Sequence, residues 1–375
     1  MSKLEELIKE FCPNGVEYKK IKECYNRLKG TPITAGKMKE IESSVGNVTI
    51  FAGGKTVVVA KEQDIPNANI IRVPAVVVQS RGIIDVIYCN SPFTFKNEMW
   101  AYSSKEETSV KYLFYYLKSK IQLLRDSAAG MGALPQISLS ATEELQIPLP
   151  ALPVQREIVR ILDSFTLYSA ELTAELTARR KQYEFYRDKL LTFDDTISAN
   201  VKKIELGNIA DIAVGTKPEQ VFEEKNLYEY INAGTTNSGY VDSYNCLGDT
   251  VTTPSRGQGG IGFVGYQRQN FWLGPLCYKI KSNTDEVLTK YIFHYLQNNT
   301  NLILSLKKEG GVPAVNRSDL VKIPLIYPPR AVQERIVKVL DNFDAICSDL
   351  GIGLPAEIEK RQKQYEYYRD KLLTF

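Results

Sequence analysis

The sequence carries almost the same twelve residues at two places. Residues 182–193 read QYEFYRDKLLTF and residues 364–375 read QYEYYRDKLLTF, so eleven of the twelve positions are identical. Chance or a shared helical composition does not easily produce such a match, and a duplicated unit of about 180 residues is the first hypothesis. Any fold for this chain must therefore accommodate two similar halves.

Further landmarks recur in the same order in both halves. A strand-like entry closes at a turn at residues 30–32 and at 215–218, and an apolar stretch ending in glycine occurs at 50–53 and at 231–234. A Ser-Arg-Gly triplet follows a β-branched run in each half, and the segments VKYLFYYL and TKYIFHYL are typical of helices. This order predicts two mixed α+β globules, each followed by a long helix that begins after a proline-containing junction.

Each long helical segment carries an apolar heptad seam. The second seam contains one extra step of four residues, a stutter, and Gly351, Gly353 and Pro355 weaken the helix there. We therefore expect a bend or a local break at that point and a straighter first helix. The predicted coiled-coil and subunit-interface residues are Ile158, Leu162, Phe165, Leu172, Leu176, Tyr183, Tyr186 and Leu190 in the first segment and Ile336, Leu340, Phe343, Leu350, Tyr365, Tyr368 and Leu372 in the second.

Both segments are too long to fold around one globule, so each seam needs a long partner, and the other segment is available. Because the first helix carries the chain from globule one to globule two, the second must return antiparallel. We therefore expect an α+β fold in which two repeated mixed α/β globules are separated by two long antiparallel coiled-coil helices with approximate twofold symmetry. Tandem tetrapeptides, SAEL-TAEL at 169–176 and CSDL-GIGL-PAEI at 347–358, suggest a spacer tuned in whole turns.

Composition and residue usage exclude several classes of protein. The net charge of +3 permits local nucleic-acid binding but does not demand it. The six cysteines include no Cys-x-x-Cys pair and His294 is the only histidine, so a zinc site lacks its ligands. The sequence begins without an apolar signal core and contains no run of eighteen apolar residues, so we expect a cytoplasmic protein without a membrane partner.

Three short motifs resemble cofactor-binding or catalytic signatures but lack the required context. Residues 257–262 match the Gly-x-Gly-x-x-Gly fingerprint, yet a strand-like segment follows where a helix should open. Residues 53–56, GGKT, lack the earlier glycine of a phosphate loop. Residues 90–93, NSPF, resemble the Asn-Pro-Pro-Phe signature of adenine aminomethyltransferases, but serine breaks the pattern. We expect no catalytic, cofactor-binding or metal-binding residues in this chain.

Polar, glycine-rich loops are the remaining candidates for function. Arginine and glutamine can grip a base edge or a phosphate through paired hydrogen bonds, and glycine lets the backbone approach DNA closely. The alternative for the arginine of each Ser-Arg-Gly triplet is a structural salt bridge, and for the lysines it is an ordinary solvated surface. The predicted DNA contacts are Lys37, Lys55, Ser80, Arg81, Lys217, Ser255, Arg256, Gln258 and Arg268, with Lys39 and Gln269 as weaker candidates.

Taken together, these features resemble the DNA-specificity subunit of type I restriction-modification enzymes. The resemblance covers essentially the whole chain. It rests on the repeat, on the junctions IPLP…VQREIVRILDSF and IPLIYPPRAVQERIVKVLDNF, and on the helix ends RRKQYEFYRDKLLTF and KRQKQYEYYRDKLLTF. It implies target-recognition domains at residues 1–150 and 195–328, each reading one half of a bipartite site in double-stranded DNA, and spacer helices at 151–194 and 329–375.

The resemblance also implies partners. Two modification subunits would dock on the helices, with restriction subunits added outside, and S-adenosylmethionine, Mg and ATP would belong to those subunits and not to this chain. Two other classes of function stay open: a stand-alone adenine DNA methyltransferase, which the missing cofactor motif disfavours, and a coiled-coil scaffold without a DNA role. The bases read cannot be inferred, because base contacts depend on loop geometry.

Overall fold

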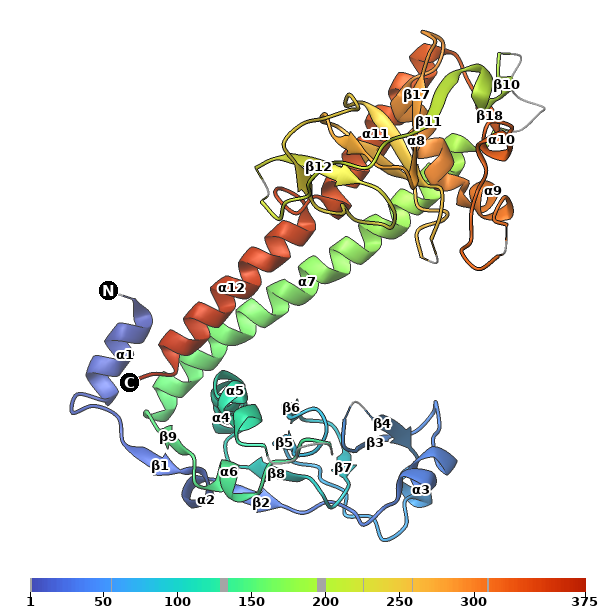
Figure 1. Ribbon diagram of the computed structural model, residues 1–375. Coiled ribbons are helices and arrows are strands. Elements are labelled where there is room, and N and C mark those ends of the chain that lie inside the picture. The colour runs from blue at the N-terminus through green and yellow to red at the C-terminus, as the bar shows by residue number, and fades with distance from the viewer. Residues whose placement is uncertain are drawn as a thin grey trace. The chain divides into compact units, whose positions relative to one another are not determined.

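A computed structural model describes residues 2–54, 56–128, 134–193, 200–224, 226–257, 259–308 and 310–375. The chain divides into two units, each with its own sheets and apolar core (Figure 1). Unit one comprises Met1–Thr173 with Ile358–Phe375, and unit two comprises Ala174–Glu357. Within the described ranges, no helix is long and apolar enough to cross a membrane.

Three sheets are found among the described residues of unit one. The first pairs β1 with β9, the second has the order β4-β3-β7, and the third has the order β2-β8-β5-β6. All neighbours are antiparallel except β3 and β7, which are parallel. The strands are β1 (Tyr18–Lys20), β2 (Asn26–Leu28), β3 (Val48–Phe51), β4 (Val57–Ala60), β5 (Ala75–Gln79), β6 (Asp85–Cys89), β7 (Phe93–Phe95), β8 (Trp100–Ser103) and β9 (Gln146–Pro148).

The core of unit one lies between the four-stranded sheet, a helix and the start of the first long helix. Every residue of β5 is buried, as the unbroken apolar run AVVV requires. The helix α4 places six buried side chains against this sheet, and Ile158 and Leu162 of α7 complete the cluster. The helices are α1 (Lys3–Phe11), α2 (Ile21–Cys24), α3 (Ala35–Glu40), η1 (Glu62–Asp64), α4 (Glu107–Ser119), α5 (Ile121–Asp126), α6 (Ser140–Glu143) and α7 (Leu152–Leu191).

Unit two repeats this set of sheets within its described residues. β10 pairs with β18, a second sheet has the order β13-β12-β16, and a third has the order β11-β17-β14-β15. As in unit one, the parallel pair lies in the three-stranded sheet, between β12 and β16. The strands are β10 (Lys202–Glu205), β11 (Ala210–Val214), β12 (Tyr228–Ile231), β13 (Tyr240–Val241), β14 (Thr250–Pro254), β15 (Gly265–Gln267), β16 (Trp272–Leu273), β17 (Cys277–Ser282) and β18 (Pro324–Tyr327).

The core of unit two has the same construction. The helix α8 packs on the four-stranded sheet, and Ile336 and Leu340 of α11 join Leu191 of α7 in the same cluster. The remaining helices are η2 (Leu206–Asn208), α8 (Thr289–Asn298), α9 (Thr300–Ser305), α10 (Arg317–Leu320), α11 (Arg330–Ser348) and α12 (Leu354–Leu372). The predicted duplication of an α+β globule is therefore confirmed.

A glycine in each unit explains why the predicted turns at 30–32 and 215–218 recur. A Cβ on Gly30 would lie 2.0 Å from the carbonyl oxygen of Phe95, and one on Gly215 would lie 1.8 Å from that of Leu273. The next amide, that of Thr31 or Thr216, donates to the same carbonyl. Only glycine lets the chain approach the edge of the parallel pair this closely, so the two turns are structurally equivalent.

In unit one, the first part of α7 pairs with α12, and Figure 1 shows the two helices alongside one another. Phe165 stacks on Tyr368 with ring centroids 5.6 Å apart and contacts Tyr365 at 6.5 Å. Leu162 shares a cluster with the end of α12, while the Arg361 guanidinium lies over the ring of Tyr168. Residues with increasing numbers along α7 contact residues with decreasing numbers along α12, so the pairing is antiparallel.

In unit two, the second part of α7 pairs with α11. Tyr183 and Tyr186 contact the ring of Phe343 at 6.1 and 5.8 Å, and Leu190 packs against the cluster that contains Ile336 and Leu340. These contacts again run antiparallel. The predicted seam positions are buried or half-buried in both units, with Tyr186, Tyr368 and Leu350 the exceptions. Tyr186 and Tyr368 are 38% and 37% exposed but still stack on a partner ring.

The second helical segment is not one long helix. It consists of α11 and α12, separated by residues 349–353, so the predicted local break is confirmed and the expectation of a second continuous helix is corrected. The Asp349 carboxylate accepts hydrogen bonds from the amides of Gly351 and Ile352 and holds the intervening turn. A Cβ on Gly353 would lie 2.5 Å from the carbonyl oxygen of Ala345, so the return path needs glycine.

One predicted seam residue is wrong for the same reason. Leu350 falls in this turn and is 78% exposed, so it does not pack in the seam. By contrast, α7 is continuous over 40 residues, as the uninterrupted first seam predicted.

Candidate nucleic-acid interface

The Ser-Arg-Gly triplet of unit one forms a turn at the end of β5. Gln79 ends the strand, and the Ser80 carbonyl then accepts a hydrogen bond from the Ile137 amide at 2.9 Å. The Gly82 amide donates to the Pro135 carbonyl at 2.8 Å, and Gly82 has a φ of +80°. Residues 135–137 therefore form hydrogen bonds with both ends of the turn. Glycine supplies the left-handed backbone conformation that the turn needs.

The triplet of unit two is held in the same way at the end of β14. The Ser255 carbonyl accepts from the Val315 amide at 2.9 Å, and the Gly257 amide donates to the Pro313 carbonyl at 3.1 Å. Gly257 has a φ of +124°. The two turns, called the Ser-Arg-Gly turns below, thus share their strand position, their bracing segment and their glycine conformation.

The arginine of each Ser-Arg-Gly turn is exposed. Arg81 and Arg256 lie on isolated bridges with Gln136 and Ala314, which fix their backbones and leave their side chains outside. Within the described residues neither guanidinium makes an ion pair or a hydrogen bond, so the alternative of a structural salt bridge finds no support. Each turn therefore presents an unneutralised, five-donor cation at an equivalent place.

The serines of the two turns require a correction. Ser80 is 0% and Ser255 is 5% exposed, and the Ser80 hydroxyl donates to the Glu98 carbonyl. Both side chains are buried, so neither serine presents its hydroxyl at the surface, and the expectation of side-chain contacts with DNA at these two positions is corrected. The serines support the turns instead.

The other predicted contacts lie at scattered positions. Lys37 pairs with Glu40 at 2.7 Å on the short helix α3, whereas Lys217 is exposed just after the Gly215 turn. Lys39, Arg268 and Gln269 are exposed. Lys55 and Gln258 lie outside the described residues.

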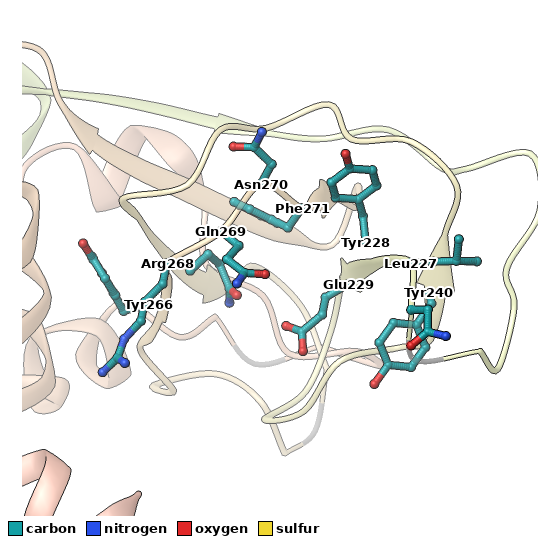
Figure 2. A pocket seen from close by; sticks show the side chains of 11 residues that line it. Leu227, Tyr228, Glu229, Tyr240, Tyr266, Arg268, Gln269, Asn270 and Phe271 are labelled. Atoms are coloured by element: carbon teal, nitrogen blue, oxygen red, sulfur yellow. The ribbon is translucent and has the colours of Figure 1, made fainter. Parts of the chain in front are cut away.

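A polar hollow of about 660 Å³ lies beside β12, β13 and β15 in unit two (Figure 2). Arg268 and Gln269 line it from one segment and Glu229 from another, with Tyr228 and Tyr240 contributing aromatic walls. A neighbouring hollow shares Glu229, Tyr266 and Gln267 with it and extends to Pro254, the residue before the Ser-Arg-Gly turn. The predicted residue Arg268 and the turn of Arg256 therefore border one connected polar surface.

A repeated ionic contact fixes the globular part of each unit on its long helix. In unit one, Lys111 of α4 pairs with Asp163 of α7 at 2.8 Å, and the Tyr115 hydroxyl donates to the same carboxylate at 2.6 Å. In unit two, Lys290 of α8 lies 3.5 Å from Asp341 of α11, and His294 takes the place of the tyrosine with its Nε2 at 2.9 Å.

The environment of this contact in unit two perturbs both charges. Burial raises the pKa of Asp341, but the hydrogen bond with His294 and the charge of Lys290 outweigh burial, so this pKa lies below its ordinary value. Burial lowers the pKa of Lys290, whose ammonium lies 3.7 Å from the centroid of the Tyr266 ring. The contact therefore fixes the orientation of α8 on α11 through a partly desolvated pair.

Sequence reasoning missed both this contact and the segment that braces the turns, although the repeat carried a signal for each. The lysine stands at the second position of both VKYLFYYL and TKYIFHYL, and the aspartate stands at the fourth position of both RILDSF and KVLDNF. The bracing segments read LPQI at 134–137 and VPAV at 312–315. Comparing the two halves position by position would have identified both. Glu229 carried no such signal, because the two halves differ there.

The comparisons with known proteins agree with this repeat. The family described as "Type I restriction modification DNA specificity domain" matches the chain over residues 13–179 and again over residues 199–360. The chain therefore belongs to this family and carries two copies of its DNA-recognition domain.

Individual relatives have the same description. The chain is 32% identical over 297 residues to the EcoR124I/EcoR124II specificity subunit of Escherichia coli, a match that covers 72% of each protein. It is 29% identical to a putative type I restriction enzyme specificity subunit of Haemophilus influenzae, over 76% of this chain and 77% of that protein. A solved S subunit of a type I restriction-modification system from M. genitalium has the same fold, with a TM-score of 0.69 at 19% identity over 96% and 97% of the two chains.

Proposed function

We propose that each globule of this chain reads one half of a bipartite site in double-stranded DNA. The observation that carries the proposal is the pair of Ser-Arg-Gly turns, which present Arg81 and Arg256 unpaired at equivalent places. Arginine recognises both phosphates and guanine edges through paired hydrogen bonds. The same backbone frame with different surrounding side chains suits two readers of unlike sequences.

The helices are proposed to set the distance between the half-sites and to dock two copies of one partner. Phe185 of α7 and Tyr367 of α12 are each 61% exposed and stand at the one position of the repeated dodecapeptide that is not identical, where both copies keep an aromatic ring. Packing inside the chain does not require exposed residues to match. Their repetition, together with the surrounding charged residues, is accounted for if the same protein binds both helix ends.

The partners are proposed to be two modification subunits, with restriction subunits added outside them. A solved chain similar to this one in fold, with a TM-score of 0.58, comes from a study titled as the structural basis of complex assembly and conformational transition of the type I R-M system. In this proposal S-adenosylmethionine, Mg and ATP are bound by the partners. The present chain is non-catalytic and works in the cytoplasm, where the DNA lies.

The test is genome-wide mapping of methylated adenine after co-expression with candidate modification subunits. A split motif with a fixed gap, formed only when both components are present, is expected. The substitution Arg81→Ala should weaken recognition of the first half-site. The substitution Arg256→Ala should weaken recognition of the second half-site. Arg72→Ala is the matched control, because Arg72 already pairs with Glu62 at 2.7 Å.

Three outcomes would contradict the proposal. Methylation by the purified chain alone would establish the methyltransferase alternative. If both arginine variants methylate the same motif as the wild type, the Ser-Arg-Gly turns do not take part in DNA recognition. Failure of the chain to protect any duplex, with active partners present, would favour the scaffold alternative.

A further inference from the structure

The hollow beside β12 holds three polar side chains with free hydrogen-bonding capacity. Glu229, Arg268 and Gln269 are exposed and make no side-chain hydrogen bond or ion pair with any other described residue. Two of their neighbours differ in this respect. The side-chain amide of Gln267 donates to the Thr252 hydroxyl, and the side-chain oxygen of Asn270 accepts from the backbone amide of Gly248. The free set therefore consists of a carboxylate, a guanidinium and an amide.

The carboxylate limits what can fill this hollow. A phosphate would meet like charge at Glu229, whereas an amino group would find an acceptor there. Among base edges in the major groove, glutamate accepts from the cytosine amino group and arginine donates to O6 and N7 of guanine. Figure 2 shows the side chains of Glu229 and Arg268 extending from their two segments to the same side of the hollow. The chemistry of the set thus corresponds to the two members of one base pair.

Unit one keeps the backbone of this region and changes its chemistry. The Lys96 amide donates to the Phe51 carbonyl as the Gly274 amide donates to the Ile231 carbonyl, so Thr49, two residues before Phe51, is the counterpart of Glu229. Thr49 is half-buried and uncharged. The antiparallel pairs Val76 with Tyr88 and Val251 with Tyr266 make Asn90 the counterpart of Arg268. A conserved frame with exchanged polar groups is the pattern expected where two domains read different bases.

We infer that the hollow of unit two reads a C·G base pair in the second half-site, with Glu229 accepting from the cytosine amino group and Arg268 donating to the guanine. The inference rests on the proposed function and assigns its base-reading residues. Tyr240, which pairs with Glu229 across β12 and β13, positions the carboxylate strand.

The experiment compares full-length variants, each co-expressed with the modification subunits, by mapping methylated adenine. Glu229→Gln keeps the shape and replaces the acceptor by an amide suited to adenine. Arg268→Lys keeps the charge and loses the two-pronged donor. Each should reduce the preference for C·G at one position of the second half-site by between about 5-fold and about 150-fold. The first half-site and the remaining positions of the second half-site should not change, and the unchanged second half-site positions show that unit two is folded.

Asp242→Asn is the matched control, since Asp242 is an exposed carboxylate of the same unit that does not line the hollow. It should leave both half-sites unchanged. A split motif whose second half contains no C·G pair would overturn the inference and leave the proposed function standing. So would uniform weakening across all sites in Arg268→Lys without a change in base preference, because that marks a phosphate contact. The absence of any split motif in the wild type would overturn the proposed function itself.

Discussion

Deleting Thr173–Leu176 from α7 should shorten the gap between the two half-sites without changing either half-site. The deletion removes one tetrapeptide of the SAEL-TAEL pair and keeps the heptad spacing of the seam. In the shortened helix, Arg179 stands three positions after Leu172, and Tyr183 stands seven positions after it. The steps of three and four are preserved. Both cores remain intact, since the deleted residues belong to neither.

The size of the change follows from helix geometry. Four residues of α-helix correspond to about 6 Å of length and about 40° of rotation beyond a full turn. One turn of DNA contains about 10 base pairs, rises about 34 Å and rotates through 360°. A change of about 6 Å in length therefore corresponds to about two base pairs, and a rotation of about 40° corresponds to about one base pair. The expected shortening is therefore one or two base pairs. Strain in the partly shortened helix pair decides between the two values.

Methylated-adenine mapping after co-expression with modification subunits measures the gap directly. The length-preserving double variant Thr173→Ala with Glu175→Ala is the control. It removes the hydroxyl contact with Ser169 and a long ion pair with Arg179, and it should leave the gap unaltered. An unchanged gap in the deletion variant, with both half-sites still read, would refute the idea that α7 sets the spacing.

Three further predictions concern stability. Leu162→Ala should lower the free energy of unfolding of unit one by about 2–5 kcal/mol, because Leu162 is 0% exposed and its loss leaves a cavity. Gly215→Ala should destabilise unit two by about 1–3 kcal/mol or more through its clash with the Leu273 carbonyl. A hydrogen bond from Arg160 holds the pKa of Glu157 at about 2, below its ordinary value of 4.5. Glu157→Gln should therefore lower stability at pH 7, and the difference should shrink progressively as the pH falls from about 4.5 through about 2.

Denaturant and thermal unfolding of the full chain would measure all three, with each unit followed as its own transition. Gly259→Ala is the control for Gly215→Ala, since a Cβ there meets nothing within 4 Å. A change of less than 1 kcal/mol for Leu162→Ala would contradict the assigned core. A difference between Glu157→Gln and wild type that is as large at pH 2 as at pH 7 would show that the carboxylate acts through packing and not through charge.

The features that sequence predicted well are those that backbone sterics and periodicity fix. The turn at Gly215 recurs because no side chain fits against the Leu273 carbonyl, and α7 is continuous because its seam is unbroken. The break before α12 was visible in Gly351 and Gly353 for the same reason. Such signals act locally or repeat along the chain, so they can be found without knowing which segments meet.

The errors occurred where distant contacts decide. Ser80 looked like a loop residue, but its hydroxyl is satisfied by Glu98, and its carbonyl by an amide more than fifty residues away. Leu350 fitted the seam by counting and was displaced by the turn that Asp349 caps. The hollow around Glu229 depends on which strands pair. None of these placements follows from periodicity, because side-chain burial in loops is a tertiary property.

The division between shared and exchanged residues has a consequence for how recognition can change. Residues that hold each turn, such as Gly82 and Gly257, are common to both units, whereas Thr49 and Glu229 occupy one backbone position with unlike chemistry. A substitution at the second kind of position alters one reader and leaves its frame and the other reader unaffected. Because linked readers multiply their specificities, changing a single half-site reader is enough to create a new overall site. The variant Glu229→Gln would then move methylation to a new set of genomic sites that still share the original first half-site.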